Sequence, residues 1–170
     1  MPELNLKKMA EIQRRVEDNS NQLQEIVDSI VKPYSRDLDK YVTFVKECLS
    51  DQDYPPTDED LEDFCMNLST YIYFAGAMCE QLGIKDDISK AIWKEVYNKN
   101  RDSEVKGTVA DKNTIAELAS QQEYLVNVCY QRAYKILKSK VENAQELLQS
   151  CKKVLSRRMQ EQSLTQIGGK

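Results

Sequence analysis

The sequence predicts an all-α, elongated multi-helix subunit that ends in a long amphipathic helix and is oligomeric. The chain has 170 residues but only five glycines and four prolines, and no proline follows Pro56. Hydrophobic residues recur in alternating steps of three and four, and no Asn-Gly or glycine-rich hairpin separates alternating apolar runs. Charged residues make up 31% of the chain. The sequence therefore favours helices that bury narrow stripes over a thick globular core.

Residues 1–100 are expected to form a region of four helices. The first runs from about residue 4 to residue 30, and polar Asn19 lies within its apolar seam. In a coiled coil such a residue fixes register and the number of partners. The alternative is a helix that packs on the body of the protein and leaves Asn19 partly solvated. The seam consists of Met9, Ile12, Val16, Asn19, Leu23, Ile26 and Ile30.

Pro33 predicts a kink or a break after the first helix, because proline disfavours helix in the residue before it. A second helix follows over residues 35–49, and then an acidic loop near residues 51–57. Thr57 is expected to cap a third helix that continues to about Leu82, where Gly83 would end it. A fourth helix is expected over residues 85–98.

Residues 101–161 are predicted to contain a polar connection and the long C-terminal helix. Thr114 and Glu117 match a capping box that would start this helix, which would continue to about Met159 and span roughly 65–70 Å. A helix of that length needs a partner, and an uninterrupted heptad seam predicts that it holds subunits of a homo-oligomer together. The seam consists of Tyr134, Leu137, Val141, Ala144, Leu148, Cys151 and Leu155. Residues 162–170 are expected to be a disordered tail.

Composition argues against an enzyme, a metal site or a bound cofactor. The chain has no histidine, and its five cysteines form no CxxC pair. No Walker loop, GxSxG or HExxH motif occurs. The absence of an 18-residue apolar run argues against a membrane span, and a start without an apolar signal core favours the cytoplasm.

Charge is uneven along the chain, although the net charge is only -4. Eight acids and no base lie between Glu47 and Asp63, whereas the sides of the C-terminal helix are basic. The acidic run could meet a basic partner surface, and the basic helix favours contact with a polyanion. Both could equally be ordinary solvated helix faces.

Aromatic and basic residues alternate around residues 93–112. Rings can stack on bases while cations neutralise phosphates, so this segment is the candidate site for single-stranded nucleic acid. The alternative places Trp93 and Tyr97 in the core beside an ordinary loop. The candidate residues are Trp93, Lys94, Tyr97, Lys99, Arg101, Lys106 and Lys112.

Three short stretches and the helix that follows them resemble the UvsY family, the recombination mediators of bacteriophages. The stretches are Ser103-Glu104-Val105-Lys106, Ala110-Asp111-Lys112 and Gln122-Glu123-Tyr124. The resemblance covers about residues 97–161, and it retains only Lys94 of a Lys-x-Arg pair carried by the family. It implies a ring assembled through the C-terminal helix in the cytoplasm of an infected bacterium. It also implies a role in DNA recombination and repair: binding single-stranded DNA and loading a RecA-like recombinase onto strands coated by single-strand-binding protein.

Two other functions remain open from the residues alone. The chain could be a helical adaptor, scaffold or inhibitor that binds another protein and no nucleic acid. It could also be a structural subunit of a virion.

Overall fold

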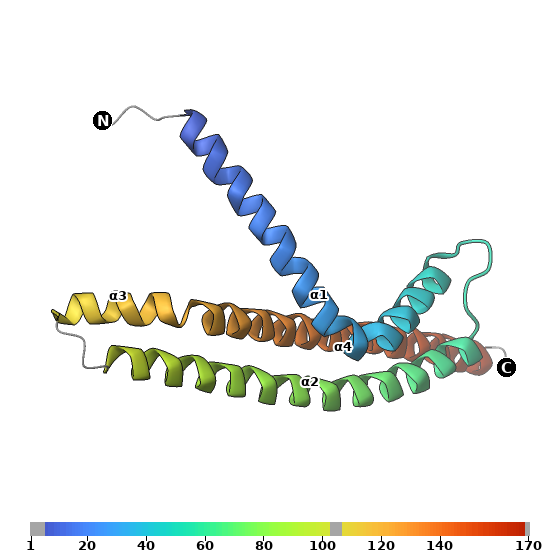
Figure 1. Cartoon of the computed structure of the whole chain (residues 1–170). Coiled ribbons are helices and arrows are strands. Elements are labelled where there is room, and N and C mark those ends of the chain that lie inside the picture. The colour runs from blue at the N-terminus through green and yellow to red at the C-terminus, as the bar shows by residue number, and fades with distance from the viewer. Residues whose placement is uncertain (1–5, 103–106, 169–170) are drawn as a thin grey trace. The chain divides into compact units, whose positions relative to one another are not determined.

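The computed structural model describes residues 6–102 and 107–168, and within them every regular element is a helix (Figure 1). The helices are α1 (Leu6–Ser50), α2 (Asp58–Arg101), α3 (Val109–Ala119) and α4 (Gln121–Gly168). The predicted all-α fold class is confirmed.

Contacts divide the chain into two units, each built from segments distant in sequence. Unit 1 comprises Met1–Lys32 with Gly83–Ala133, and unit 2 comprises Pro33–Leu82 with Tyr134–Lys170. The units do not follow the predicted division near residue 100, because α1, α2 and α4 each contribute residues to both.

Helix α1 continues through Pro33, so a break at this residue is excluded, whereas the alternative of a kink stays a prediction. An interior proline costs a helix about 3 kcal/mol, because it lacks an N–H and its ring crowds the preceding turn. The apolar residues on both sides are almost fully buried: Val31 is 3% exposed and Leu38 is 3% exposed. Their burial favours a continuous helix and outweighs the local preference of proline.

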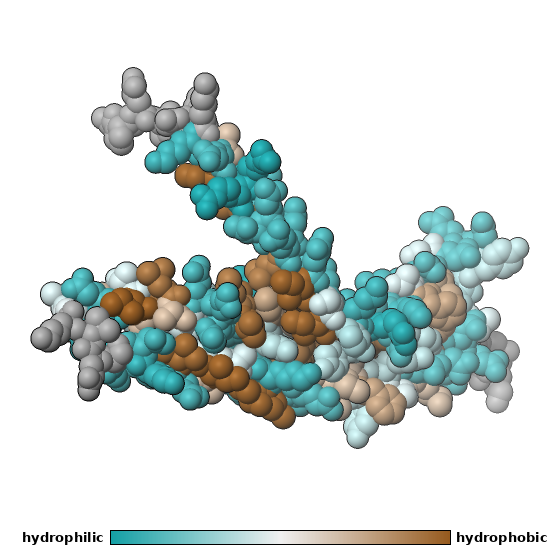
Figure 2. Space-filling model, viewed as in Figure 1, coloured by the Kyte–Doolittle hydropathy of each residue, from teal (hydrophilic) through white to brown (hydrophobic). Residues whose placement is uncertain are grey.

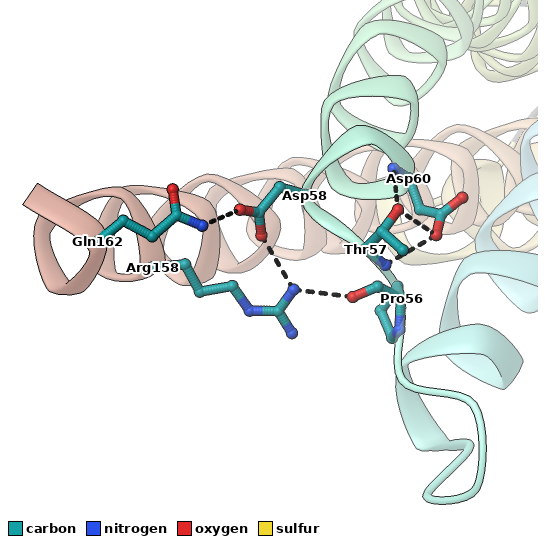
Figure 3. A network of polar contacts seen from close by, with 6 residues as sticks. All are labelled: Pro56, Thr57, Asp58, Asp60, Arg158 and Gln162. Atoms are coloured by element: carbon teal, nitrogen blue, oxygen red, sulfur yellow. Dashed lines mark hydrogen bonds and ion pairs between the residues drawn. The ribbon is translucent and has the colours of Figure 1, made fainter. Parts of the chain in front are cut away.

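Helix α2 begins as predicted but does not end at Gly83. The Thr57 hydroxyl accepts a hydrogen bond from the Asp60 backbone N–H at 3.1 Å, and the Asp60 carboxylate accepts one from the Thr57 N–H at 2.8 Å. This confirms the cap, and Figure 3 shows it. Gly83 has no positive φ and lies inside the helix, so the predicted third and fourth helices are one. A single glycine costs a helix interior only about 1 kcal/mol, and the neighbouring Leu82 is fully buried.

The start of the next helix also differs from the prediction. The capping box is formed by Thr108 and Asp111, six residues before the predicted pair, and Thr114 lies inside α3, where its hydroxyl donates to the Ala110 carbonyl. Buried Ser120 separates α3 from α4, so the predicted single helix is two helices. Helix α4 then continues to Gly168, where the sequence predicted a disordered tail from residue 162.

The core of unit 2 covers the heptad seam of α4. Leu148 and Cys151 pack with Val45 of α1 and with Leu61 and Leu68 of α2, and Leu155 packs against the same cluster. A second cluster joins Ala144 of α4 to Leu38 of α1 and Ala75 of α2, with Val141 beside it.

This burial corrects the predicted role of the α4 seam. Leu137, Ala144 and Cys151 have no exposed surface, and Leu148 retains only 8%. Side chains that fill the core of their own chain cannot also pack against a second copy, so the seam is an internal packing surface. A helix as long as α4 needs other helices to pack against, and within unit 2 the helices α1 and α2 provide that surface.

Some of the basic side chains of α4 form ion pairs with acidic side chains of α1 and α2. Lys140 of α4 pairs with Asp39 of α1 at 2.6 Å. Arg158 of α4 donates to the Asp58 carboxylate at 3.1 Å and to the Pro56 carbonyl at 2.8 Å, as Figure 3 shows. Gln162 donates to the other Asp58 oxygen at 2.9 Å. One acid of the Glu47–Asp63 run therefore meets a basic surface of its own chain.

Candidate nucleic-acid interface

An open groove in unit 1 contains three of the predicted nucleic-acid-binding residues. Trp93, Lys94 and Tyr97 line it from α2, and the opposite wall comes from α3 and the first turn of α4. Its volume is about 900 Å³. The other lining residues are Asn98, Thr114, Glu117, Leu118, Ser120, Gln121 and Tyr124.

Partly exposed aromatic rings are the most distinctive feature of this groove. Trp93 and Tyr97 are half-buried, so part of each ring remains open to solvent. The Trp93 and Tyr124 rings lie 5.3 Å apart between centroids and are tilted by 57°. Tyr124 is 47% exposed. The arrangement leaves aromatic surface facing an open space.

Tyr124 is a lining residue that the candidate set omitted. It lies 31 positions after Trp93 in the sequence, and only the packing of α4 beside α2 brings the two rings together. The sequence signal was its place in the Gln122-Glu123-Tyr124 stretch, which supported the family resemblance.

The predicted cations are not gathered in one place. Lys94 lines the groove and is exposed. At 3.6 residues per turn, Lys99 lies about 120° or more around α2 from Trp93, Lys94 and Tyr97. Lys90 instead lies one turn before Lys94 on the same face and is exposed, although the candidate set did not include it.

The other predicted cations are Arg101, Lys112 and Lys106, and none of them lines the groove among the described residues. Arg101 forms an ion pair with Asp102 at 3.0 Å, and this hydrogen bond raises the pKa of Arg101 and lowers the pKa of Asp102. Lys112 lies in the first half of α3, where its charge also lowers the pKa of Asp102. Lys106 lies outside the described residues. Glu117 adds a negative charge to the groove wall.

The groove is suited to stacking contacts and has few charges in its lining. Among the described residues there is no group of three or more His, Cys, Asp or Glu side chains that could hold a metal ion. The same part of the chain contains no helix with the length and apolar character needed to cross a membrane.

Comparisons with protein families, with curated proteins and with solved structures gave no match to this chain. The resemblance to the UvsY family therefore stays a prediction from the quoted stretches.

Proposed function

We propose that this protein binds single-stranded DNA in the groove between α2 and the α3–α4 junction, and that it acts without chemistry. The observation that carries the proposal is the set of three rings, Trp93, Tyr97 and Tyr124, that line an open groove with Lys94 at its wall. Successive unpaired bases stack on such rings regardless of sequence, and a neighbouring cation neutralises a phosphate.

The resemblance to phage recombination mediators suggests what this binding is for. A mediator holds single-stranded DNA while a RecA-like recombinase replaces single-strand-binding protein. Weak stacking contacts suit that task, because the strand must be passed on. The groove has few charges, with Lys94 and Glu117 in its lining, which fits a site that holds DNA briefly.

The sole tryptophan of the chain gives a direct test. Because Trp93 lines the groove, a base that stacks on it should quench its fluorescence. We expect an oligothymidylate to quench Trp93 in low salt and a labelled oligonucleotide to gain anisotropy over the same protein concentrations. Both signals should weaken as salt rises, because binding neutralises phosphates.

Two lysines provide a matched pair of variants. Lys94→Glu places a negative charge in the groove and should weaken binding and reduce the salt dependence. Lys99→Glu makes the same change on a different face of α2 and should have a much smaller effect. Trp93→Ala should weaken binding by about 1–3 kcal/mol for the lost stacking contact. Absence of quenching and of anisotropy at micromolar protein in low salt would reject the proposal, as would equal effects of the two lysine variants.

A protein-binding adaptor is the second candidate, and a specific observation favours it. Ile84, Ile88 and Ile92 repeat every four residues along α2 and are each about half exposed. Figure 2 shows hydrophobic side chains in a stripe along this helix. An exposed apolar stripe is typical of a surface that binds another protein. A stable complex with a bacterial or phage protein that Ile88→Asp abolishes, in the absence of oligonucleotide binding, would favour this function.

A further inference from the structure

The N-terminal part of α1 has an apolar seam that no described part of its own chain covers. Every residue from 8 to 22 is exposed. Met9, Ile12 and Val16 keep 42%, 51% and 62% of their surface in solvent. In Figure 2 this part of α1 is largely hydrophilic, with hydrophobic side chains among the polar ones. The helix is therefore amphipathic without a covering surface over its first four turns.

A helix in that situation has little to stabilise it. Most of the stability of protein helices comes from packing an apolar face, and isolated helices of about 12–15 residues are marginal in water. The Arg14–Asp18 pair, at 3.8 Å, adds little, because both side chains are exposed and solvent screens their charges. A covering partner would supply the missing burial.

The spacing of the seam defines what kind of surface would cover it. Met9, Val16, Leu23 and Ile30 occupy heptad position a, and Ile12, Asn19 and Ile26 occupy position d. The pattern persists for three heptads, about 32 Å at 1.5 Å per residue, which is the pattern of a coiled-coil helix. The complementary surface for such a seam is another helix with the same repeat.

A second copy of α1 satisfies this requirement without repulsion between charges. In a parallel, in-register pair the g residue of one helix faces the following e residue of the other. Arg15 would face Ser20, and Lys8 would face Gln13. No pair at these positions places like charges together.

Asn19 selects the parallel arrangement. In register, Asn19 lies beside Asn19 of the other copy, and the two amides can hydrogen-bond. In an antiparallel pair a d residue lies beside an a residue, so Asn19 would lie against Val16 or Leu23. An unpaired buried amide is destabilising, because it loses its hydrogen bonds to water and gains none in return. The polar residue thus favours one register.

We propose that the α1 seam joins copies of this chain in a parallel, in-register coiled coil through its exposed part, Met9 to Asn19 and Ile26, since Leu23 and Ile30 are already half-buried. β-branched residues at d favour three or more chains over two, so Ile12 and Ile26 imply at least three copies. Leu125 and Val126 of α4 are about half exposed and line a groove with Leu23, Ile26 and Ile30. The apolar surface therefore continues from the seam onto α4, where a neighbouring copy would also pack. This assembly does not depend on DNA binding.

Light scattering after size-exclusion chromatography tests the assembly. Two variants introduce the same carboxylate, one in the seam and one on the outer face of α1. The wild type should have at least three times the monomer mass of 19.7 kDa. Ile12→Asp places a carboxylate in the seam and should give a monomer that loses at most the helical circular dichroism of the first turns of α1. Asn21→Asp adds the same group at the outer f position and should leave the mass unchanged. A monomeric wild type would overturn the proposal, as would an Ile12→Asp variant of wild-type mass, and a dimer would contradict the inferred chain number.

Cross-linking tests the orientation. Met9→Cys should form a disulfide between copies under mild oxidation, because a parallel register brings the two positions together. Arg14→Cys, at an outer f position, should link much less. An intact oligomer in which Met9→Cys fails to link would overturn the parallel arrangement.

Discussion

Buried thiols are the residues whose ionisation most clearly depends on the fold. Burial raises the pKa of Cys65, Cys79, Cys129 and Cys151 above the ordinary thiol value of 9.0. It also raises the pKa of the Tyr41 phenol. Each of these groups becomes negatively charged when it loses its proton, and burial disfavours the charged form. The folded state therefore holds these protons more tightly than the unfolded chain does. The cysteines thus behave as small hydrophobic residues, as their apolar helical positions predicted.

These shifts predict a loss of stability in alkali. Above pH 9.0 the unfolded chain releases its thiol protons first, so it binds fewer protons than the folded chain and the free energy of unfolding falls as pH rises. Urea unfolding followed by circular dichroism at pH 8 and at pH 10 should show the decrease. Cys151→Ala should be less stable at pH 8 but should lose less between the two values. Constant or rising stability over this interval would contradict the assignment.

At the scale of the helix, local sequence signals predicted where helices begin better than where they end. Thr57 with Asp60 and Thr108 with Asp111 both form capping boxes, and the sequence identified the first but chose Thr114 and Glu117 for the second. Both pairs near α3 fit the pattern, and only the backbone geometry at Thr108 distinguishes them. Pro33 was expected to kink or break a helix and Gly83 to end one, yet α1 and α2 continue through these positions. Burial of Val31, Leu38 and Leu82 outweighs both local signals. Cap residues are readable from sequence because they act within one turn, whereas burial depends on distant segments.

The two threonines near α3 make the cap assignment testable. Thr108→Ala removes the acceptor for the Asp111 N–H and should cost about 1 kcal/mol of local stability. Thr114→Ala removes only a hydroxyl bonded within its own helix and should change stability by less than about 0.5 kcal/mol. Amide hydrogen exchange across α3 would measure both. Faster exchange in Thr114→Ala than in Thr108→Ala would favour the start predicted from the sequence.

At the scale of the whole molecule, the spacing of hydrophobic residues identified the apolar seams of α1 and α4. It did not identify the surface that covers each seam. Both seams advance by three and four, and the pattern contains no information about which surface lies opposite. The α4 seam was assigned to subunit contacts and is buried within unit 2, whereas the start of the α1 seam is exposed. The groove residues Trp93, Lys94 and Tyr97 could be predicted because they lie within one turn of α2. Tyr124 could not be placed beside Trp93 by spacing, because their contact depends on packing between two helices.

Substitution of Leu148 distinguishes an internal seam from an intermolecular one. Leu148 packs against a cluster that includes Val45, Leu61 and Phe64, so Leu148→Asp would bury an unpaired carboxylate there. We expect a loss of several kcal/mol and unfolding of unit 2, because burial of an uncompensated charge is among the costliest single changes. Thermal unfolding followed by circular dichroism would show it.

The same substitution at an intermolecular seam would have a different result. It would leave a well-folded chain of lower mass, as we expect for Ile12→Asp. Leu148→Asp should therefore lose the helical signal and thermal stability of unit 2, while Ile12→Asp should lose mass, keep unit 2 folded and lose at most the helical signal of the first turns of α1. A stable, fully helical Leu148→Asp monomer would instead make the α4 seam the subunit contact and require unit 2 to fold without it.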